Sequence, residues 1–392
     1  MSAPAGSTAT VAGTREESVA SQMSFLDRYL ALWIGAAMVI GLLAGRLIPG
    51  FSDAITAIEI DGVSLPIALG LLVMMYPPLA KVRYDRMGTI AADKRLVVLS
   101  LVLNWLVGPA LMFTFAWLLL PDLPEYRTGL IIVGLARCIA MVIIWNDLAC
   151  GDRDAAAFLV TLNSIFQIVM FAVLGWFYLS VLPGWLGLPQ DDLDVSMWQI
   201  AKSVLIFLGI PLLAGYLSRK LLEARKGRDW YEGAFLPKIS PFALYGLLFT
   251  IVILFALQGR QIISNPGDVA RIALPLLAYF AVMWIVALLA SKAIGLGYER
   301  SATVAFTAAG NNFELAIAVA IGTFGAASGQ ALAGVVGPLI EVPVLVGLVY
   351  VSLWLRKRMF GEHADGTPVA ARSAADEADT PSASTPTPGR NG

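Results

Sequence analysis

Residues 307–318 have the sequence TAAGNNFELAIA, which places two amides and a carboxyl group inside an otherwise apolar stretch. Residues 134–147, GLARCIAMVIIWND, have the same character, with an arginine, a cysteine and a polar end. Gly310 followed by Asn311 and Asn312 combines a helix breaker with side chains that can satisfy freed peptide groups. In a membrane, an open backbone is tolerated only inside protein or beside a water-filled cavity. We therefore predict that both stretches are interrupted helices that build a transport site.

The composition of the whole chain is that of a polytopic membrane protein. Of its 392 residues, 58% are hydrophobic and 14% are charged, whereas soluble domains carry about 25% charged residues. The balance of 27 basic and 28 acidic residues argues against a nucleic-acid partner. The single histidine, His363, lies in a polar tail, and two cysteines exclude a disulfide scaffold. We expect neither an enzyme nor a protein that carries a cofactor.

Ten segments are apolar enough to cross a bilayer core, which needs about 20 residues of helix. The loops between them alternate in charge: those after the second and sixth segments are basic, and those after the first and fifth contain acidic but no basic residues. The positive-inside rule then places both termini in the cytoplasm, in a plasma membrane or bacterial inner membrane. The predicted segments are 29–48, 65–80, 96–120, 128–148, 155–182, 197–217, 239–257, 269–296, 301–324 and 335–355.

The predicted fold is all-α, with ten transmembrane helices in two five-helix repeats, residues 25–182 and 183–360. Because five is an odd number, the second repeat enters the membrane inverted relative to the first. The motif LLAG, near the end of the first segment of each half, is a weak sign of such a repeat. Inverted repeats with a midplane site recur in secondary transporters. The polar tails, 1–24 and 361–392, are predicted to be disordered and cytoplasmic.

Cys138 lies near the middle of the fourth segment, directly after Arg137. A neighbouring positive charge and an exposed helix end both favour the thiolate, which is a soft ligand for soft metals and metalloids. The alternative is an inert buried thiol. Cys150, the other cysteine, would lie about 18 Å further along a continuous helix, too far to share one ion. A single thiolate suits a passenger that must be released as well as captured.

Glu314 is the acid of the ninth segment. A carboxyl group in the membrane that meets water on each side in turn is a candidate proton carrier, with Arg137 as its expected partner; the alternative is a structural hydrogen bond between helices. Asn311 and Asn312 either satisfy the helix break or orient the passenger. Secondary candidates, each with a structural alternative, are Glu341 between two prolines, Asn146 and Asp147.

Five motifs, spread over about residues 24–360, resemble the arsenite efflux permeases of the arsenical-resistance type, within the bile acid/arsenite/riboflavin transporter superfamily. The resemblance implies ten helices in two inverted repeats, with the fourth and ninth helices broken and crossed. It also implies export of trivalent arsenic, often with antimonite, in exchange for protons. The membrane cysteine that the family requires falls on Cys138, and its conserved acid on Glu314. The motifs are MMYPPLAKV (74–82), ARCIAMV (136–142), WND (145–147), AGNNFELAIA (309–318) and GPLIEVP (337–343).

We therefore expect arsenite to bond to the sulfur of Cys138 while Asn311, Asn312 and Arg137 orient its oxygens and Glu314 couples protons. The main alternative is a sodium-coupled carrier of organic anions, as in the bile-acid branch, where the amides and Glu314 would hold sodium. That model has no use for Cys138. A membrane sensor or assembly subunit would leave the two broken helices unexplained. Preference for arsenite or antimonite, proton stoichiometry and assembly into a homo-oligomer stay open.

Overall fold

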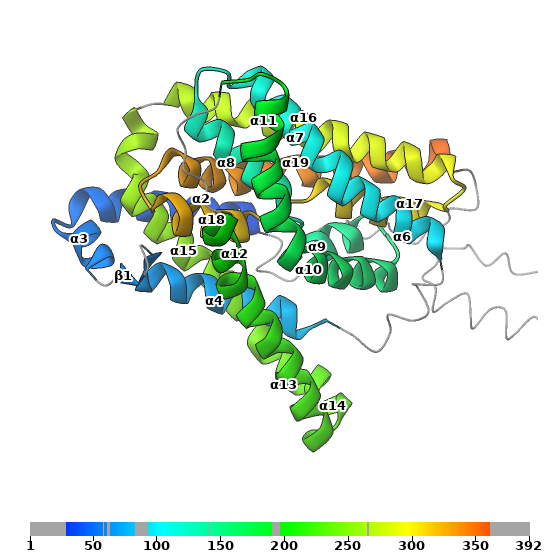
Figure 1. The fold of residues 1–392 in the computed structure, drawn as a ribbon. Coiled ribbons are helices and arrows are strands. Elements are labelled where there is room, and N and C mark those ends of the chain that lie inside the picture. Colours follow the sequence, from blue (N-terminus) through cyan, green and yellow to red (C-terminus); the bar gives the residue numbers. More distant parts are fainter. Residues whose placement is uncertain are drawn as a thin grey trace, which may run out of the picture.

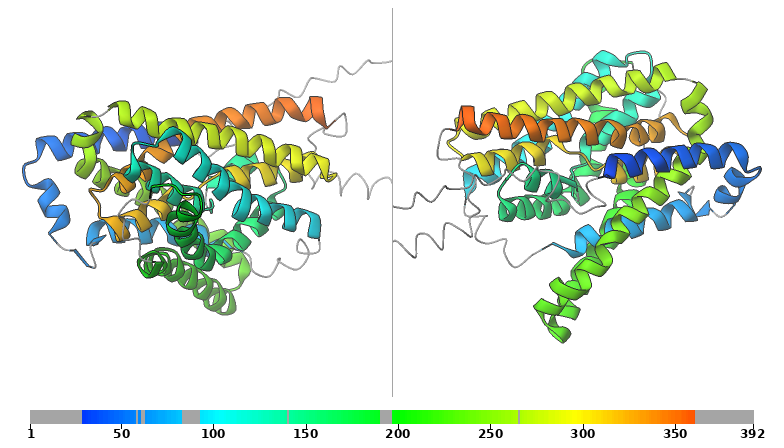
Figure 2. Two further views of the ribbon diagram at one scale, coloured as in Figure 1. Left: turned by 45° about the horizontal axis from the view of Figure 1, so that its top comes forward. Right: turned by 180° about the vertical axis from the view of Figure 1, so that it is seen from behind.

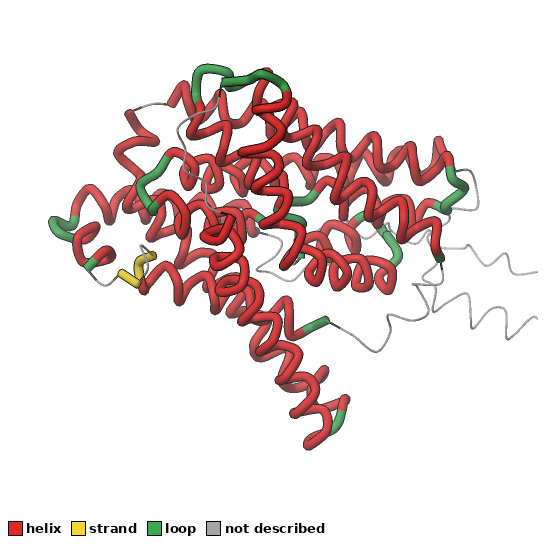
Figure 3. Tube along the Cα trace, in the orientation of Figure 1, coloured by secondary structure: helices red, strands yellow, loops and turns green. Residues whose placement is uncertain are grey.

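The computed structural model describes residues 29–57, 59–60, 63–82, 93–139, 141–189, 197–264 and 266–360. Within these ranges the chain is almost entirely helical (Figure 3). The strands in this part of the chain are β1 (Glu59–Ile60) and β2 (Val63–Ser64), a short antiparallel pair in which Glu59 lies opposite Ser64. The predicted tails, His363 and the acidic residues of the loop at 190–196 lie outside the described residues.

Eight of the ten apolar segments predicted from the sequence correspond to helical runs, and the fourth and ninth each correspond to two helices separated by a break. The first five correspond to α2 (Leu30–Leu47), α4 (Leu65–Ala80), α6–η3–α7 (Lys94–Val102, Leu103–Val107, Gly108–Leu119), α8 and α9 (Pro124–Leu135, Met141–Leu148) and α10–η4–α11 (Arg153–Trp176, Phe177–Val181, Leu182–Trp185), where η marks a π-helical turn. The next five correspond to α12–η5–α13 (Met197–Val204, Leu205–Gly209, Ile210–Lys226), α15 (Leu236–Ser264), α16 (Pro266–Ala293), α17 and α18 (Tyr298–Ala309, Phe313–Phe324) and α19 (Gly329–Met359). The short α3 (Phe51–Thr56), α14 (Arg228–Trp230) and η6 (Tyr231–Phe235) complete the described helices.

Among the described residues, six helical runs are long and apolar enough to cross a membrane, judged by length and composition. Three further apolar helices are shorter, among them α4 and α18. Their outward faces carry many exposed aliphatic and aromatic side chains, as expected of a surface solvated by lipid. These helices mark the chain as an integral membrane protein. The six runs are Lys94–Leu119, Arg153–Trp185, Trp198–Lys226, Arg228–Leu257, Pro266–Ala293 and Gly329–Arg356.

The helices α2, α4, α13 and α15 form one packed group, in which α15 lies against both α2 and α4 (Figure 1). Glycines allow these backbones to meet. A Cβ atom at Gly45 of α2 would lie 2.2 Å from the carbonyl oxygen of Ala256 in α15. A Cβ atom at Gly246 of α15 would lie 2.8 Å from the backbone nitrogen of Met74 in α4. Small residues bring membrane helices into this kind of close contact, where van der Waals packing is the main attraction.

The end of α13 projects from the helical body with α14 at its tip (Figures 1 and 2). Residues of α13 and η6 contact the C-terminal end of α4. Arg219 donates to the carbonyl oxygen of Lys81 at 3.2 Å, and the Tyr231 hydroxyl donates to that of Ala80 at 3.0 Å. These bonds satisfy the carbonyl groups that any helix leaves unpaired at its C-terminal end. The end of α4 is thereby anchored beside the cavity described below.

A second group of helices surrounds the two interrupted segments. α16 lies against α7, α17 and α19, and α19 also contacts α8 and α18. The interruptions between α8 and α9 and between α17 and α18 lie inside this group, and almost every residue around them is buried. Burial in protein is the condition under which open backbone is tolerated at membrane depth.

Candidate functional site

The two helix interruptions are paired with each other. The backbone N–H of Asn312 donates to the carbonyl oxygen of Ala136 at 3.0 Å, and that of Cys138 donates to Gly310 at 3.4 Å. Arg137 and Asn311 thus face each other as a single antiparallel bridge. Each open segment satisfies the backbone of the other, which explains how both persist away from water. The sequence predicts the two breaks but not this pairing.

Cys138 is 3% exposed and lies three residues before the start of α9. The backbone N–H groups of Met141 and Val142 lie within hydrogen-bonding reach of its thiol. They belong to the first turn of α9, so the positive end of the helix dipole faces the sulfur. Cys138 also packs against Gly310, where a Cβ atom would lie 3.0 Å from the Cβ and 3.6 Å from the sulfur of Cys138. The sulfur is therefore embedded in the paired break.

The two asparagines of the second break have different environments. The side-chain oxygen of Asn312 accepts the backbone N–H of Leu315 at 3.0 Å and so caps α18. Its amide nitrogen, and both polar side-chain atoms of Asn311, have no hydrogen-bond partner among the described residues, although both residues are at most 2% exposed. Buried polar groups are nearly always satisfied. These amides are therefore candidates to bind a polar ligand, together with the Nε and Nη2 atoms of Arg137, which also lack a partner among the described residues.

Arg137 does not pair with Glu314, and the expectation that it would is wrong. Its guanidinium group is fully buried and donates to the hydroxyl of Tyr279 at 2.9 Å and to the carbonyl of Ala308 at 3.4 Å. Its backbone N–H donates to the side chain of Gln167. Successive residues of an extended segment point to opposite sides, so the side chain of Arg137 leaves the bridge on the side away from Cys138. No described carboxylate forms an ion pair with it.

Two carboxyl groups flank the break in different ways. Glu341 of α19 is 1% exposed, and its Oε1 accepts the backbone N–H of Asn311 at 3.3 Å. Glu314, in the first turn of α18, is partly exposed and lines a cavity. Both carboxyl groups lie close enough to Cys138 to act on its thiol electrostatically. The structure thus brings one thiol and two carboxyl groups to the same break.

Asn146 and Asp147 lie at the far end of α9. The Asn146 side chain is fully buried and accepts a hydrogen bond from the Thr303 hydroxyl of α17 at 2.7 Å. Asp147 forms an ion pair with Arg153, with 2.8 Å between the Nε and Oδ1 atoms. Neither residue lines the cavity at the break. Their contacts hold the end of α9 against the helices beside it.

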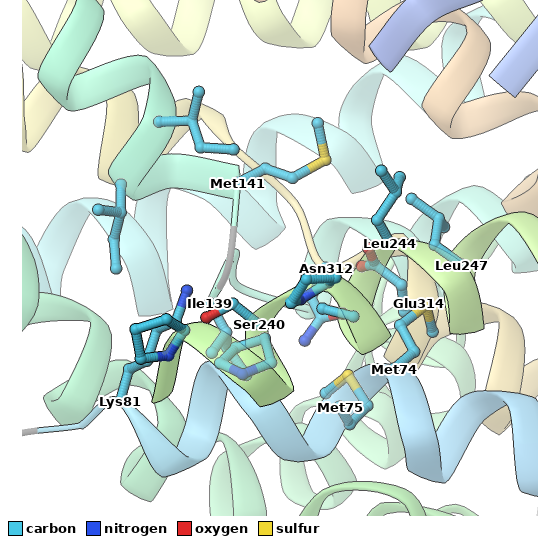
Figure 4. A pocket seen from close by; sticks show the side chains of 16 residues that line it. Met74, Met75, Lys81, Ile139, Met141, Ser240, Leu244, Leu247, Asn312 and Glu314 are labelled. Carbon is cyan, nitrogen blue, oxygen red and sulfur yellow. The ribbon is translucent and has the colours of Figure 1, made fainter. Parts of the chain in front are cut away.

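A cavity of about 460 Å³ lies between α4, α15 and the helix break. Figure 4 shows Lys81 on one side of it and Glu314 on the other, with Asn312 between them and Met74 and Met75 along α4. Cys138 does not line it. Nothing in the sequence marked Met74, Met75 or Ser240 as lining residues, although only one residue separates the two methionines from the prolines inside α4. The lining residues are Met74, Met75, Pro78, Lys81, Ile139, Met141, Ile143, Ile144, Pro237, Ser240, Pro241, Ala243, Leu244, Leu247, Asn312 and Glu314.

Comparison with known proteins identifies the family. The sequence profile of the sodium bile acid symporter family matches residues 68–265. The arsenical-resistance protein Acr3 of Corynebacterium glutamicum is 63% identical over 347 residues, which are 88% of this chain and 94% of that protein. This chain belongs to the Acr3 family. Acr3 of Alkaliphilus metalliredigens is 34% identical over 340 residues, covering 84% of this chain and 93% of that protein.

An uncharacterized transporter of Synechocystis is also related, with 36% identity over 346 residues, 83% of this chain and 88% of its own length. The resemblance drawn from the five sequence motifs is confirmed. The protein is an Acr3-type membrane transporter of the arsenical-resistance class.

Proposed function

We propose that this Acr3-family protein exports arsenite from the cytoplasm across the cell membrane in exchange for protons. The observation that supports this best is the paired helix break, which gathers Cys138, two buried amides and Glu314 beside one cavity. The chemistry of this set suits trivalent arsenic, because a thiolate is a soft ligand and the amides can bond to hydroxyl groups on the metalloid. Antimonite has the same chemistry and is proposed as a second substrate.

The proposed path begins at the Lys81 side of the cavity, which the basic loop after α4 assigns to the cytoplasm. Arsenite reaches the helix break, where the sulfur of Cys138 replaces one hydroxyl group. An As–S bond forms and an As–O bond breaks, the thiol proton leaves with the hydroxide as water, and arsenic stays trivalent. Cys138 does not line the cavity, whereas Ile139 and Met141 do, so we propose that the cavity wall near these residues opens before the sulfur is reached.

The remaining residues of the break have distinct proposed roles. Asn311 and Asn312 orient the hydroxyl groups of the bound arsenic through their unpaired amide atoms. Arg137, which is bonded to Tyr279 and Ala308, positions the break. A buried cation held by neutral partners also places positive charge beside the site without neutralising Glu314.

Glu314 is the proposed proton carrier, because it is the carboxyl group of the break that lines the cavity. Arsenite is uncharged near neutral pH, so membrane voltage alone would move it poorly and proton exchange supplies direction. Proton entry onto Glu314 from the outer side favours release of arsenic and resetting. We propose that residues 25–182 and 183–360 are inverted five-helix repeats, with both termini cytoplasmic, whose broken helices cross at this point.

A sodium-coupled carrier of organic anions is the second candidate, and the match to the sodium bile acid symporter profile favours it. Amide and carboxylate oxygens of the break could coordinate sodium. In that case Cys138 has no chemical role, and its substitution would not affect transport.

The decisive experiment is arsenite uptake into everted vesicles with an acid interior. We expect uptake that depends on the pH gradient, is lost in Cys138→Ser and is kept in Cys150→Ser, the matched control at the exposed thiol. Glu314→Gln should retain folded protein but lose the response to the gradient. Equal uptake by wild type and Cys138→Ser would remove the thiol from the mechanism. Sodium-dependent uptake of a bile acid, with no uptake of arsenite, would establish the second candidate instead.

A further inference from the structure

The cavity at the helix break is larger and more apolar than arsenite needs. Its volume of about 460 Å³ lies within the range of roughly 300–1,000 Å³ found for sites that hold drug-sized ligands. Arsenite is a single arsenic atom with its hydroxyl groups, and its recognition calls for polar contacts. The polar side chains of the lining are Lys81, Ser240, Asn312 and Glu314, and all the others are apolar.

The apolar side chains form a wall beside the polar end of the cavity. Figure 4 shows Met74 and Met75 on α4, Leu244 and Leu247 on α15 and Met141 on α9 around the same space. Methionine adapts to irregular shapes, and its thioether makes favourable contacts with aromatic rings. The two thioethers of α4 and the two leucines of α15 therefore provide room for a flat apolar group whose polar end lies at the break.

We propose that this cavity also binds trivalent organoarsenicals, R–As(OH)₂, in which R is an apolar group up to the size of a phenyl ring. The inference rests on the proposed arsenite function, since the arsenic would occupy the same place at the break. Its hydroxyl groups face Asn312 and Glu314, and the ring lies against the wall formed by the methionines and leucines.

The bond exchange is the one proposed for arsenite. The sulfur of Cys138 replaces one hydroxyl group and gives R–As(OH)–S, the thiol proton leaves with the hydroxide as water, and arsenic remains trivalent. The As–C bond is untouched, so no oxidant or reductant is needed. Burial of R from water adds affinity in proportion to its apolar area, and we expect a phenyl compound to bind about tenfold or more tightly than a methyl compound.

The test uses purified full-length protein with Cys150→Ser in proteoliposomes, so that Cys138 is its only thiol. Arsenite uptake driven by a pH gradient is measured with phenylarsonous acid or methylarsonous acid as competitor. We expect half-inhibition by the phenyl compound at an about tenfold lower concentration. Equal potency of the two compounds, with arsenite uptake intact, overturns this inference and leaves the proposed function standing.

A pair of variants assigns the effect to the cavity. Ala243→Phe places a ring in the cavity wall, and it should bring the potencies of the phenyl and methyl compounds close together. Val73→Phe adds the same ring on the exposed side of α4, at a residue 43% exposed, and should keep both uptake and the tenfold difference. A tenfold difference that survives in Ala243→Phe shows that the ring binds elsewhere and overturns the proposal.

Binding is also measured without transport, from the rise in melting temperature that each compound causes in detergent. A larger rise with the phenyl compound in Val73→Phe than in Ala243→Phe supports the cavity, and equal rises contradict it. If wild-type protein takes up no arsenite, the proposed function fails, and this binding measurement alone decides the organoarsenical site.

Discussion

Arg137 and Tyr279 are hydrogen-bonded in the interior of the helical body, with 2.9 Å between Nη1 and the phenolic oxygen and neither residue exposed. The Tyr279 hydroxyl also lies 3.3 Å from the carbonyl oxygen of Ala308, at the end of α17. The tyrosine thus joins the cation of the first break to the helix that enters the second. Burial of a guanidinium group without a carboxylate partner costs free energy. Hydrogen bonds to two neutral partners, the Tyr279 hydroxyl and the Ala308 carbonyl, offset part of that cost.

Tyr279→Phe removes one of these partners without changing the packing of the ring. We expect a loss of about 1–3 kcal/mol in the free energy of unfolding, because a donor of a buried charged group is left unpaired. Thermal unfolding in detergent measures this, with Tyr245→Phe at a 53% exposed position as the control. Equal melting temperatures of the two variants would show that water replaces the hydroxyl.

Gly310→Ala should impair transport more than folding. The added Cβ would lie 3.0 Å from the Cβ of Cys138, so the thiol must shift within the paired break. Small displacements of a reacting group are expensive, and we expect arsenite uptake to fall about tenfold. Gly347→Ala in α19, where a Cβ meets no atom within 4 Å, is the control. Full activity of Gly310→Ala would show that the position of the sulfur is not critical.

Gly45→Ala and Gly35→Ala are a matched pair in α2. A Cβ at Gly45 would lie 2.2 Å from the carbonyl of Ala256, whereas one at Gly35 meets no atom within 4 Å. Forcing α2 away from α15 should cost about 1–3 kcal/mol of stability. The Gly35 variant should match or exceed wild type, since alanine favours the helix. Melting temperatures in detergent compare the two, and an equal effect would mean that the close contact does not contribute.

Glu341→Gln and Glu341→Ala separate two roles of this carboxyl group. Glutamine keeps an acceptor for the Asn311 N–H, whereas alanine leaves that buried donor unpaired, at a cost of about 1–3 kcal/mol. If the role is structural, Glu341→Gln retains gradient-driven arsenite uptake and Glu341→Ala loses stability. Uptake by Glu341→Gln that no longer responds to the pH gradient would assign the proton to Glu341 in place of Glu314.

Asp122 should make no contribution to the pH dependence of transport. Hydrogen bonds from Arg271 lower the pKa of its carboxyl group from 3.8 to about 2. Because the folded pKa is depressed, the pair stabilises the fold above about pH 4, and this stabilisation is lost as the pH falls toward 2. Asp122→Asn should therefore leave the uptake profile unchanged between about pH 5 and pH 8. A shifted profile would implicate this exposed pair in coupling.

The positions of the helices and of their two interruptions could be predicted from the sequence. Apolar length predicts a membrane helix directly, and a Gly-Asn-Asn run within such a helix has few explanations other than a break. The direction of the side chains at the break could not be predicted from the sequence. The expected pairing of Arg137 with Glu314 followed from charge alone, but the bridge between Arg137 and Asn311 turns the guanidinium group toward Tyr279.

The residues of the cavity wall could not be predicted from the sequence either, because tertiary contacts bring them together. Ala243, Leu244 and Leu247 resemble any other apolar residues of a membrane helix, and only the packing of α15 against α4 places them beside Glu314. Tyr279 was a polar ring in an apolar segment, and that was its only sign in the sequence.

The pairing of the two breaks has a consequence for biosynthesis. The backbone of the first break is satisfied by residues that the ribosome adds more than 150 positions later, since the N–H of Cys138 awaits the carbonyl of Gly310. Until then the peptide groups of the first break lack their partners from the second. We expect each half, expressed separately, to be degraded in the cell, and co-expression of the two halves to restore the full transporter.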